Sequence, residues 1–287
     1  MSLKYEKLIR KMTLAEKAVM MSGKNTWETV DFEKYGIPSM VMSDGPHGLR
    51  RQAGAGDHLG LNASLPATCF PTAAGVANSW DEALGEEIGE ALAEEAVTMG
   101  VNVILGPGLN IKRSPLCGRN FEYYSEDPLL AGKMAAGMVR GIQSQHIGAS
   151  VKHFAANNKE TNRKHSDSRV SERALREIYL KQFEIIVKES DPWTIMSSYN
   201  VINGHRASEN KELLEDILRG EWGFRGMVTT DWWTRGEHYK EIKAGNDVKM
   251  ATGYPERVKK AMELGEITRA DLEHCARRVL ELILKID

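Results

Sequence analysis

Short apolar segments recur along the chain, and most of them end in polar or glycine-rich residues. Segments of this length, bounded by turn residues, are typical of strands that are buried on both faces of a sheet. The clearest segments are 39–42, 101–105, 149–152, 193–196, 227–230 and 247–250, with 72–76 as a weaker candidate. We therefore predict a sheet that lies in the interior of the protein.

Between most of these segments the apolar residues take up a helical spacing. In the clearest case they follow Asp81 at four-residue steps, at Leu84, Ile88, Leu92 and Ala96. Asp81 and Thr268 are of the types that cap helix N-termini. The helices predicted in this way are 81–99, 128–145, 171–190, 211–220 and the segment after Thr268. The charged segment 1–23 is expected to form an amphipathic helix rather than a signal peptide.

The alternation of buried strands with helices predicts an α/β protein with a parallel sheet. Seven or eight such units fit a closed (β/α)8 TIM-like barrel, which needs about 250 residues, better than an open doubly wound sheet. No GxGxxG motif follows the first strand, which weakens the dinucleotide-binding alternative. We expect residues 1–287 to form a single domain.

Composition excludes several classes of function. The 287 residues carry 38 Lys and Arg against 40 Asp and Glu, a net charge of −2, so no bulk field favours nucleic acid or an anionic membrane. The three cysteines form no paired motif, which suits a reducing, cytoplasmic location. The eight histidines show no HExxH or other ligand spacing, so neither a metal nor another cofactor is expected.

Polar and charged residues gather where the predicted strands end. The carboxyl ends of barrel strands converge on one face, where catalytic residues lie. The residues expected there are Asp44, Arg119, Lys152, His153, Tyr199 and Asp231. Singly, each has a structural explanation, such as a turn for Asp44 or a core position for Trp232. Together they would cost several kcal/mol per buried ion unless paired, so we interpret them as a site that binds sugar hydroxyls, with an indole face for the ring.

Seven motifs then carry a family resemblance over nearly the whole chain. They are SDGPHGLR (43–50), GPGLNIKRSPLCGRNFEYYSEDP (106–128), KHFAANNKETNR (152–163), VSERALREIYL (170–180), MSSYNVING (196–204), GFRGMVTTDW (223–232) and AGNDVKM (244–250). In these motifs the chain resembles the N-terminal barrel domain of family 3 glycoside hydrolases, in the β-glucosidase branch.

The resemblance implies a role for individual residues. Asp231 would be the catalytic nucleophile of a retaining β-glycosidase that removes terminal non-reducing β-D-glucosyl residues through a covalent intermediate. The residues that would hold this sugar are Asp44, Arg119, Lys152, His153, Arg163, Met196, Tyr199 and Trp232. A nucleophile must be ionised, and Lys152 and Arg119 are expected to lower the pKa of Asp231.

The second carboxyl group of the mechanism is expected to be missing. Retaining glycosidases need an acid/base about 5–5.5 Å from the nucleophile, and in this branch a following α/β sandwich domain supplies it. We expect this chain to end before that domain and to be a weak hydrolase alone. A complementing sandwich domain or a second copy of the chain would cover the open site. Internal candidates for the acid are Glu122, Glu126, Asp127, Glu160 and Glu237.

Other functions stay open at this point. The N-acetylglucosaminidases of the family use a histidine in an Asp-Ser-His stretch, where this chain has Arg169, although His165 lies close by. A Schiff-base aldolase could use Lys152 at a strand end. The barrel could also bind sugar without catalysis, as an inactive fragment.

Overall fold

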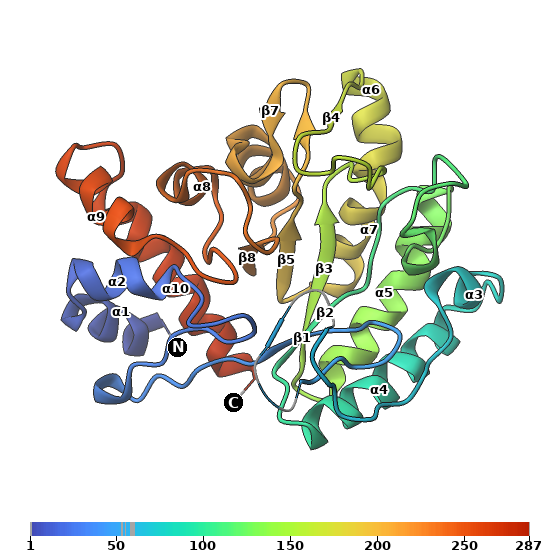
Figure 1. Ribbon diagram of the computed structural model, residues 1–287, viewed down its shortest axis with the longest axis horizontal. Helices are drawn as coiled ribbons and strands as arrows, with labels where there is room; N and C mark the ends of the chain where they lie inside the picture. Colours follow the sequence, from blue (N-terminus) through green and yellow to red (C-terminus); the bar gives the residue numbers. More distant parts are fainter. Residues whose placement is uncertain (1, 53, 55, 58–60, 287) are drawn as a thin grey trace.

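Five of the apolar segments form the central sheet of the computed structural model, which describes residues 2–52, 54, 56–57 and 61–286. All neighbouring strands are parallel, in the order β1-β2-β3-β5-β8 (Figure 1). The strands are β1 (Met42–Asp44), β2 (Val103–Leu105), β3 (Gly148–Phe154), β5 (Thr194–Ser197) and β8 (Met227–Thr230). The predicted α/β class and parallel sheet are confirmed.

Two of the predicted strands are absent from this sheet. Segment 72–76 lies in a helix, α3 (Ala73–Ala77), because the Thr72 hydroxyl accepts the Gly75 N–H at 3.2 Å and caps it. Segment 247–250 makes only isolated parallel bridges, Val248 with Thr229 and Lys249 with Ser22.

These isolated bridges lie where a closed barrel would need further parallel strands. From Ser22 the pairing continues toward β1 through antiparallel bridges, Gly23 with Thr29 and Glu28 with Val41. The chain between 23 and 41 thus turns back on itself instead of adding a parallel strand. Within the described residues the regular strands form an open five-stranded sheet rather than a closed eight-stranded barrel.

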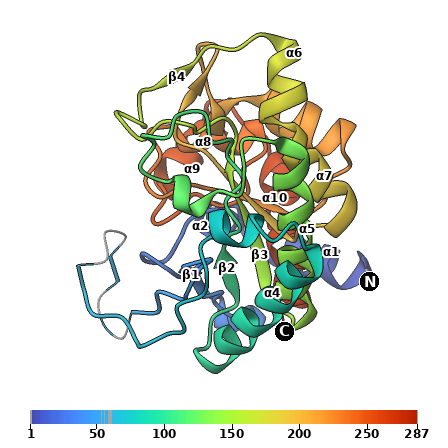
Figure 2. The same cartoon turned by 90° about the vertical axis from the view of Figure 1, so that its right-hand side faces the viewer.

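The predicted helices cover the sheet on both sides. On one side lie α4 (Glu82–Thr98), α5 (Pro128–Ser144) and α7 (Lys181–Ser190), as Figures 1 and 2 show. On the other lie α1 (Ser2–Lys11), α2 (Leu14–Met20), α9 (Pro255–Glu263) and α10 (Arg269–Lys285). Asp81 and Thr268 are the capping residues of α4 and α10, as predicted.

Several helices differ in detail from the prediction. The N-terminal segment forms two helices, because Thr13 and Glu16 make a capping box that starts α2. Segment 171–190 is divided into α6 (Glu172–Ala174), a π-helical turn η3 (Leu175–Tyr179) and α7. Segment 211–220 is the π-helix η5 (Glu212–Glu221). The remaining elements are α8 (His238–Ala244), η1 (Glu33–Tyr35), η2 (Asn120–Glu122), η4 (Ala207–Glu209) and a small sheet of β4 (Asp167–Ser168), β6 (Val201–Ile202) and β7 (His205–Arg206).

Glycines set the packing of α4 on α5. A Cβ on Gly89 would stand 2.5 Å from the Met138 carbonyl oxygen, and one on Gly141 would stand 2.1 Å from that of Glu86. The buried face of α4 therefore includes Gly85 and Gly89, while Leu84 is exposed. The four-residue spacing predicted the helix and the burial of Leu92 and Ala96 correctly, but Ile88 is only partly buried and Leu84 is exposed.

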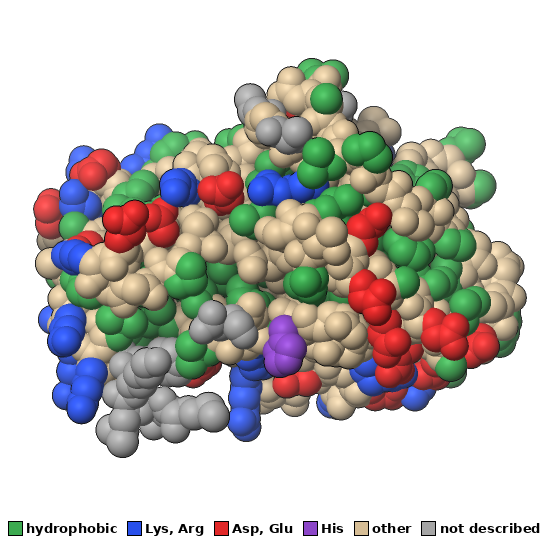
Figure 3. Space-filling view, turned by 90° about the horizontal axis from the view of Figure 1, so that it is seen from below, with side chains coloured by type: hydrophobic (Ala, Val, Ile, Leu, Met, Phe, Trp, Pro, Cys, Tyr) green, Lys and Arg blue, Asp and Glu red, His purple; other side chains and the backbone are tan. Residues whose placement is uncertain are grey.

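The face of the molecule seen in Figure 3 is not dominated by one charge sign. Both basic and acidic side chains lie on the face seen in Figure 3, in keeping with the net charge of −2. Among the described residues, no helix has the length and apolar character needed to cross a membrane.

Candidate active site

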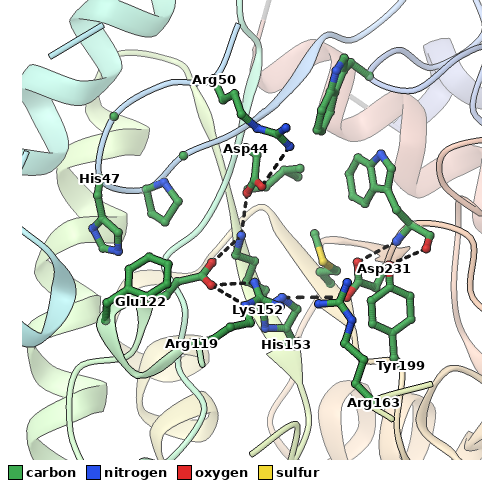
Figure 4. A pocket seen from close by; sticks show the side chains of 18 residues that line it. Asp44, His47, Arg50, Arg119, Glu122, Lys152, His153, Arg163, Tyr199 and Asp231 are labelled. Atoms are coloured by element: carbon green, nitrogen blue, oxygen red, sulfur yellow. Dashed lines mark hydrogen bonds and ion pairs between the residues drawn. The ribbon is translucent and has the colours of Figure 1, made fainter. Parts of the chain in front are cut away.

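One cavity of about 450 Å³ brings all the predicted site residues together (Figure 4). Its lining includes Asp44, Arg119, Lys152, His153, Arg163, Met196, Tyr199, Asp231 and Trp232. The strands explain this convergence. Asp44 ends β1, Lys152 and His153 lie in the last part of β3, and Asp231 directly follows β8. Because these strands are parallel, their carboxyl ends meet at one edge of the sheet.

Asp231 is buried, with one carboxylate oxygen engaged and the other without a partner. Its Oδ1 accepts the backbone N–H of Trp232 at 2.7 Å. Its Oδ2 makes no hydrogen bond of normal geometry among the described residues; His153 Nε2 lies 3.9 Å away, and Tyr199 is a further titratable neighbour whose pKa is raised by burial and then by the carboxylate. An acceptor oxygen in this state normally carries a cost. Here the residue lines a cavity that can hold a ligand, although Oδ2 itself is covered from solvent.

The electrostatics of Asp231 differ from the prediction. Burial raises its pKa above the ordinary value of 3.8, and Arg119, Arg163 and Lys152 lower it by less than burial raises it. The expectation that neighbouring cations would lower the pKa overall was wrong, because only 7% of the residue is exposed and desolvation outweighs them.

Charged side chains form a chain of alternating sign beside the cavity, and Figure 4 labels all of its members except Glu160. Its links are Arg50–Asp44 (3.5 Å), Asp44–Lys152 (2.9 Å), Lys152–Glu122 (2.8 Å), Glu122–Arg119 (2.6 Å), Arg119–Glu160 (4.0 Å) and Glu160–Arg163 (2.9 Å). The four cations and three carboxylates leave one positive charge, which an ionised Asp231 would balance.

Lys152 is the centre of this chain and is held in its charged form. Desolvation opposes the charge, but Asp44 and Glu122 outweigh it and raise the pKa of Lys152. In turn, and against their own desolvation, Lys152 lowers the pKa of both Asp44 and Glu122. A Schiff base needs a neutral amine, so this pairing argues against the aldolase alternative. It also keeps both carboxylates from serving as proton donors near neutral pH.

His153 is a neutral side chain with a fixed orientation. Burial, and then Arg119, Lys152 and Arg163, lower its pKa well below 6.5. Its Nδ1 lies 3.2 Å from Asn110 Oδ1 and 3.2 Å from the Tyr123 hydroxyl, so its Nε2 is turned toward Asp231. It can therefore exchange hydrogen bonds with a ligand without adding charge.

The other internal acid candidates lie in supporting positions. Asp127 caps α5, and Glu160 pairs with Arg163. Glu126 is exposed, and Glu237 pairs with Arg257 at 3.4 Å; neither lines the cavity. His165 is also exposed and outside the lining, so nothing in the structure supports it as the acid.

The sequence analysis missed several lining residues. These are Trp27, Gly45, Pro46, His47, Gly48, Arg50, Leu105 and Phe121, while Glu122 was predicted as a candidate acid and not as part of the sugar subsite. His47, Arg50, Phe121 and Glu122 belong to motifs that carried the family resemblance, so those motifs could have indicated them. Trp27 precedes the first strand and belongs to none of these motifs. Among the described residues, no group of three or more His, Cys, Asp or Glu is arranged to hold a metal ion.

Comparison with known proteins shows the family of this chain. Residues 15–282 match the family model for the glycosyl hydrolase family 3 N-terminal domain. The chain is 46% identical to thermostable β-glucosidase B of Acetivibrio thermocellus over 99% of its own length and 38% of the relative's. It is 49% identical to exo-α-(1→6)-L-arabinopyranosidase of Bifidobacterium longum over 96% of its length and 37% of the relative's.

Solved structures show the same likeness. The chain superposes on β-glucosidase 3B of Thermotoga neapolitana in complex with α-D-glucose with a TM-score of 0.92 and 40% identity, covering 98% of this chain and 42% of that one. It thus spans less than half the length of the relatives it matches. The chain belongs to glycosyl hydrolase family 3, and it corresponds to the family's N-terminal domain.

Proposed function

We propose that this chain carries the nucleophile and the sugar-binding subsite of a retaining β-glycosidase. Asp231 is the nucleophile, and the observation that carries this role is a buried carboxylate with an unpartnered Oδ2 in the lining of a cavity that also holds cations. Oδ2 forms a bond to the anomeric carbon while the bond to the leaving oxygen breaks. Water then cleaves the glycosyl–Asp231 ester and returns the carboxylate.

The chain of alternating charges forms the subsite for the non-reducing sugar. Asp44 and Glu122 offer acceptors, and Lys152, Arg119 and Arg163 offer donors, so sugar hydroxyls can be bound from several directions. His153 and Tyr199 complete the polar wall. Met196 and Trp232 supply apolar surface for the C–H face of the ring.

The preferred sugar is a terminal β-D-glucosyl residue. This choice rests on the several relatives named β-glucosidase and on the similar structure described in complex with α-D-glucose. One relative is named for an α-L-arabinopyranoside instead. Aryl β-D-glucosides should therefore react faster than aryl α-L-arabinopyranosides, and the reverse order would overturn the choice of sugar.

Within the described residues, the site offers Asp231 no suitable proton donor. Asp44 and Glu122 are held ionised by Lys152, and His153 is neutral. Loss of general acid catalysis costs roughly 10²–10⁴-fold in rate. We therefore propose weak hydrolysis by this chain alone, least impaired on aryl glycosides whose leaving groups need little protonation. A complementing α/β sandwich domain added in trans should restore hydrolysis of disaccharides.

The test of the proposed function is covalent trapping. A 2-deoxy-2-fluoro-β-D-glucoside with an activated leaving group does not need the acid, so it should attach one sugar to the chain. Peptide mass analysis should place that sugar on Asp231. A label on another residue, or sugar binding by calorimetry without any label, would contradict the proposed role.

A further inference from the structure

Trp27 lies between two sides of the cavity that come from distant parts of the chain. Its ring centroid is 5.6 Å from that of Trp232, with the planes tilted by 48°. The Arg50 guanidinium carbon lies 5.1 Å from the centroid of the Trp27 ring. Trp232 follows the nucleophile, and Arg50 pairs with Asp44. One side chain therefore touches groups that flank both Asp231 and Asp44.

Trp27 is itself held firmly. Its indole Nε1 donates to Gln52 Oε1 at 2.8 Å, and its backbone oxygen accepts the N–H of Met42 at 2.8 Å. Gln52 is also buried and donates to Asp57 Oδ2 at 2.7 Å. With 6% of its surface exposed, Trp27 is fixed on both the backbone and the ring.

Thr26, the residue before Trp27, also contacts Trp232. The Trp232 indole Nε1 donates to the Thr26 carbonyl oxygen at 2.6 Å. The backbone of Trp232 in turn serves the catalytic groups, because its N–H donates to Asp231 Oδ1 and its carbonyl accepts the Tyr199 hydroxyl at 2.5 Å. A shift of Trp232 would therefore disturb both contacts next to the nucleophile.

We propose that Trp27 is a positioning residue for glycosyl transfer to Asp231. The Trp27 ring fixes the positions of both the Trp232 indole and the Arg50 guanidinium. The hydrogen bond to Gln52 fixes the orientation of the Trp27 ring. This inference rests on the proposed role of Asp231 as nucleophile. Displacing a reacting group by about 1 Å can cost roughly 10²-fold in rate, so the effect should fall on the chemical step more than on folding.

The experiment compares W27F, W27A and Q52L with a matched control, W193F. Trp193 precedes β5 at the opposite end of the strand from the cavity and is absent from its lining. The first measurement is hydrogen exchange of the Trp232 indole N–H by NMR, with the resonance assigned from W232F. The second is the rate of labelling by the fluoro glycoside as a function of reagent concentration. Thermal unfolding reports the stability of each variant.

Three results are expected. Exchange of the Trp232 indole N–H should be at least about tenfold faster in W27A and intermediate in W27F, because loss of the ring contact loosens the bond to Thr26. The labelling rate at saturating reagent should fall roughly 10- to 100-fold in W27A, while the half-saturating concentration changes less. Q52L should shift both quantities in the same direction, and W193F should match the wild type in both.

The outcomes separate the two proposals. If wild-type Asp231 takes no label, the proposed function fails, while indole exchange still tests Trp27. If Asp231 is labelled but W27F and Q52L keep the wild-type exchange and saturating rate, Trp27 has only a structural role and this inference is overturned. Should W27A fail to fold, W27F and Q52L decide the question.

Discussion

Two buried lysines of this protein have opposite surroundings. Lys152 stands at the cavity, in a chain of charges that ends near an unpartnered oxygen of Asp231. Lys249 lies in a closed cluster, where its ammonium group donates to Glu241 at 2.5 Å, to the Thr234 hydroxyl at 2.7 Å and to two backbone carbonyls. The second Glu241 oxygen accepts the Ser208 hydroxyl at 2.8 Å and the Thr234 hydroxyl at 2.7 Å.

The difference lies in what is left unsatisfied. Both clusters remove charge from water, but around Lys249 the ammonium and carboxylate groups have partners within the protein, and Lys249 does not line the cavity that holds Asp231. Asp231 keeps one acceptor without a partner, and the residue lines the cavity. Buried charge alone therefore does not identify a functional site. An unsatisfied acceptor on a residue that lines a cavity is the stronger signal.

The largest effect is expected in D231N, which tests whether Asp231 distinguishes the cavity from the closed Lys249 cluster. We expect labelling and hydrolysis to fall on the order of 10⁴-fold or more, as when a nucleophile is removed. Mass analysis of fluoro glycoside labelling is the measurement. Substantial residual labelling in D231N would show that another residue attacks the sugar.

D231N should also be at least as stable as the wild type at neutral pH. Burial raises the pKa of Asp231 above 3.8, so the folded state holds its proton more tightly than the unfolded state does. That stabilisation is complete below pH 3.8 and is lost as the pH rises through the higher folded pKa. The neutral amide avoids this loss, and urea denaturation at pH 7 should show no decrease in the free energy of unfolding.

The next largest effect is expected in E241Q, which removes the charged partner of Lys249 in the closed cluster. Removing one partner of a buried ion pair costs about 3–5 kcal/mol, so the urea midpoint should fall sharply. Labelling per folded molecule should stay at the wild-type level. Loss of labelling in folded E241Q would show that the closed cluster and the cavity are coupled.

A smaller effect concerns pH. Attack needs the ionised form of Asp231, so the labelling rate should fall as the pH drops through a pKa above 3.8. Asp44 and Glu122 stay ionised to lower pH because Lys152 lowers the pKa of each. A single step in the labelling rate above pH 3.8 is expected, measured in a fixed-ionic-strength buffer series. No decline above that pH would contradict the raised pKa.

The smallest effect is expected in E237Q. Glu237 pairs with Arg257 at the surface at 3.4 Å, with 47% of its side chain exposed. Exposed ion pairs contribute about 0–1 kcal/mol, so both stability and labelling should be close to wild type. A large loss of disaccharide hydrolysis with unchanged labelling would instead identify Glu237 as the internal acid.

The sequence predicted much of the site because the strand ends are local features. Asp44, Lys152 and Asp231 each follow a short apolar run, and parallel strands must bring such ends to one edge. The direction of the Asp231 pKa shift could not be predicted from the sequence. It depends on how much water the folded chain excludes, and a list of neighbouring cations does not contain that quantity.

The sequence by itself determined the α/β class, the family, and about half of the residues that line the cavity, because each depends on local periodicity or on a motif. Only the tertiary structure decided that segment 247–250 makes isolated bridges, that Lys249 is closed off while one oxygen of Asp231 has no partner, and that Trp27 reaches Trp232 across 205 positions of sequence. Such outcomes depend on which groups meet in space, and the chain settles that only when its whole core packs.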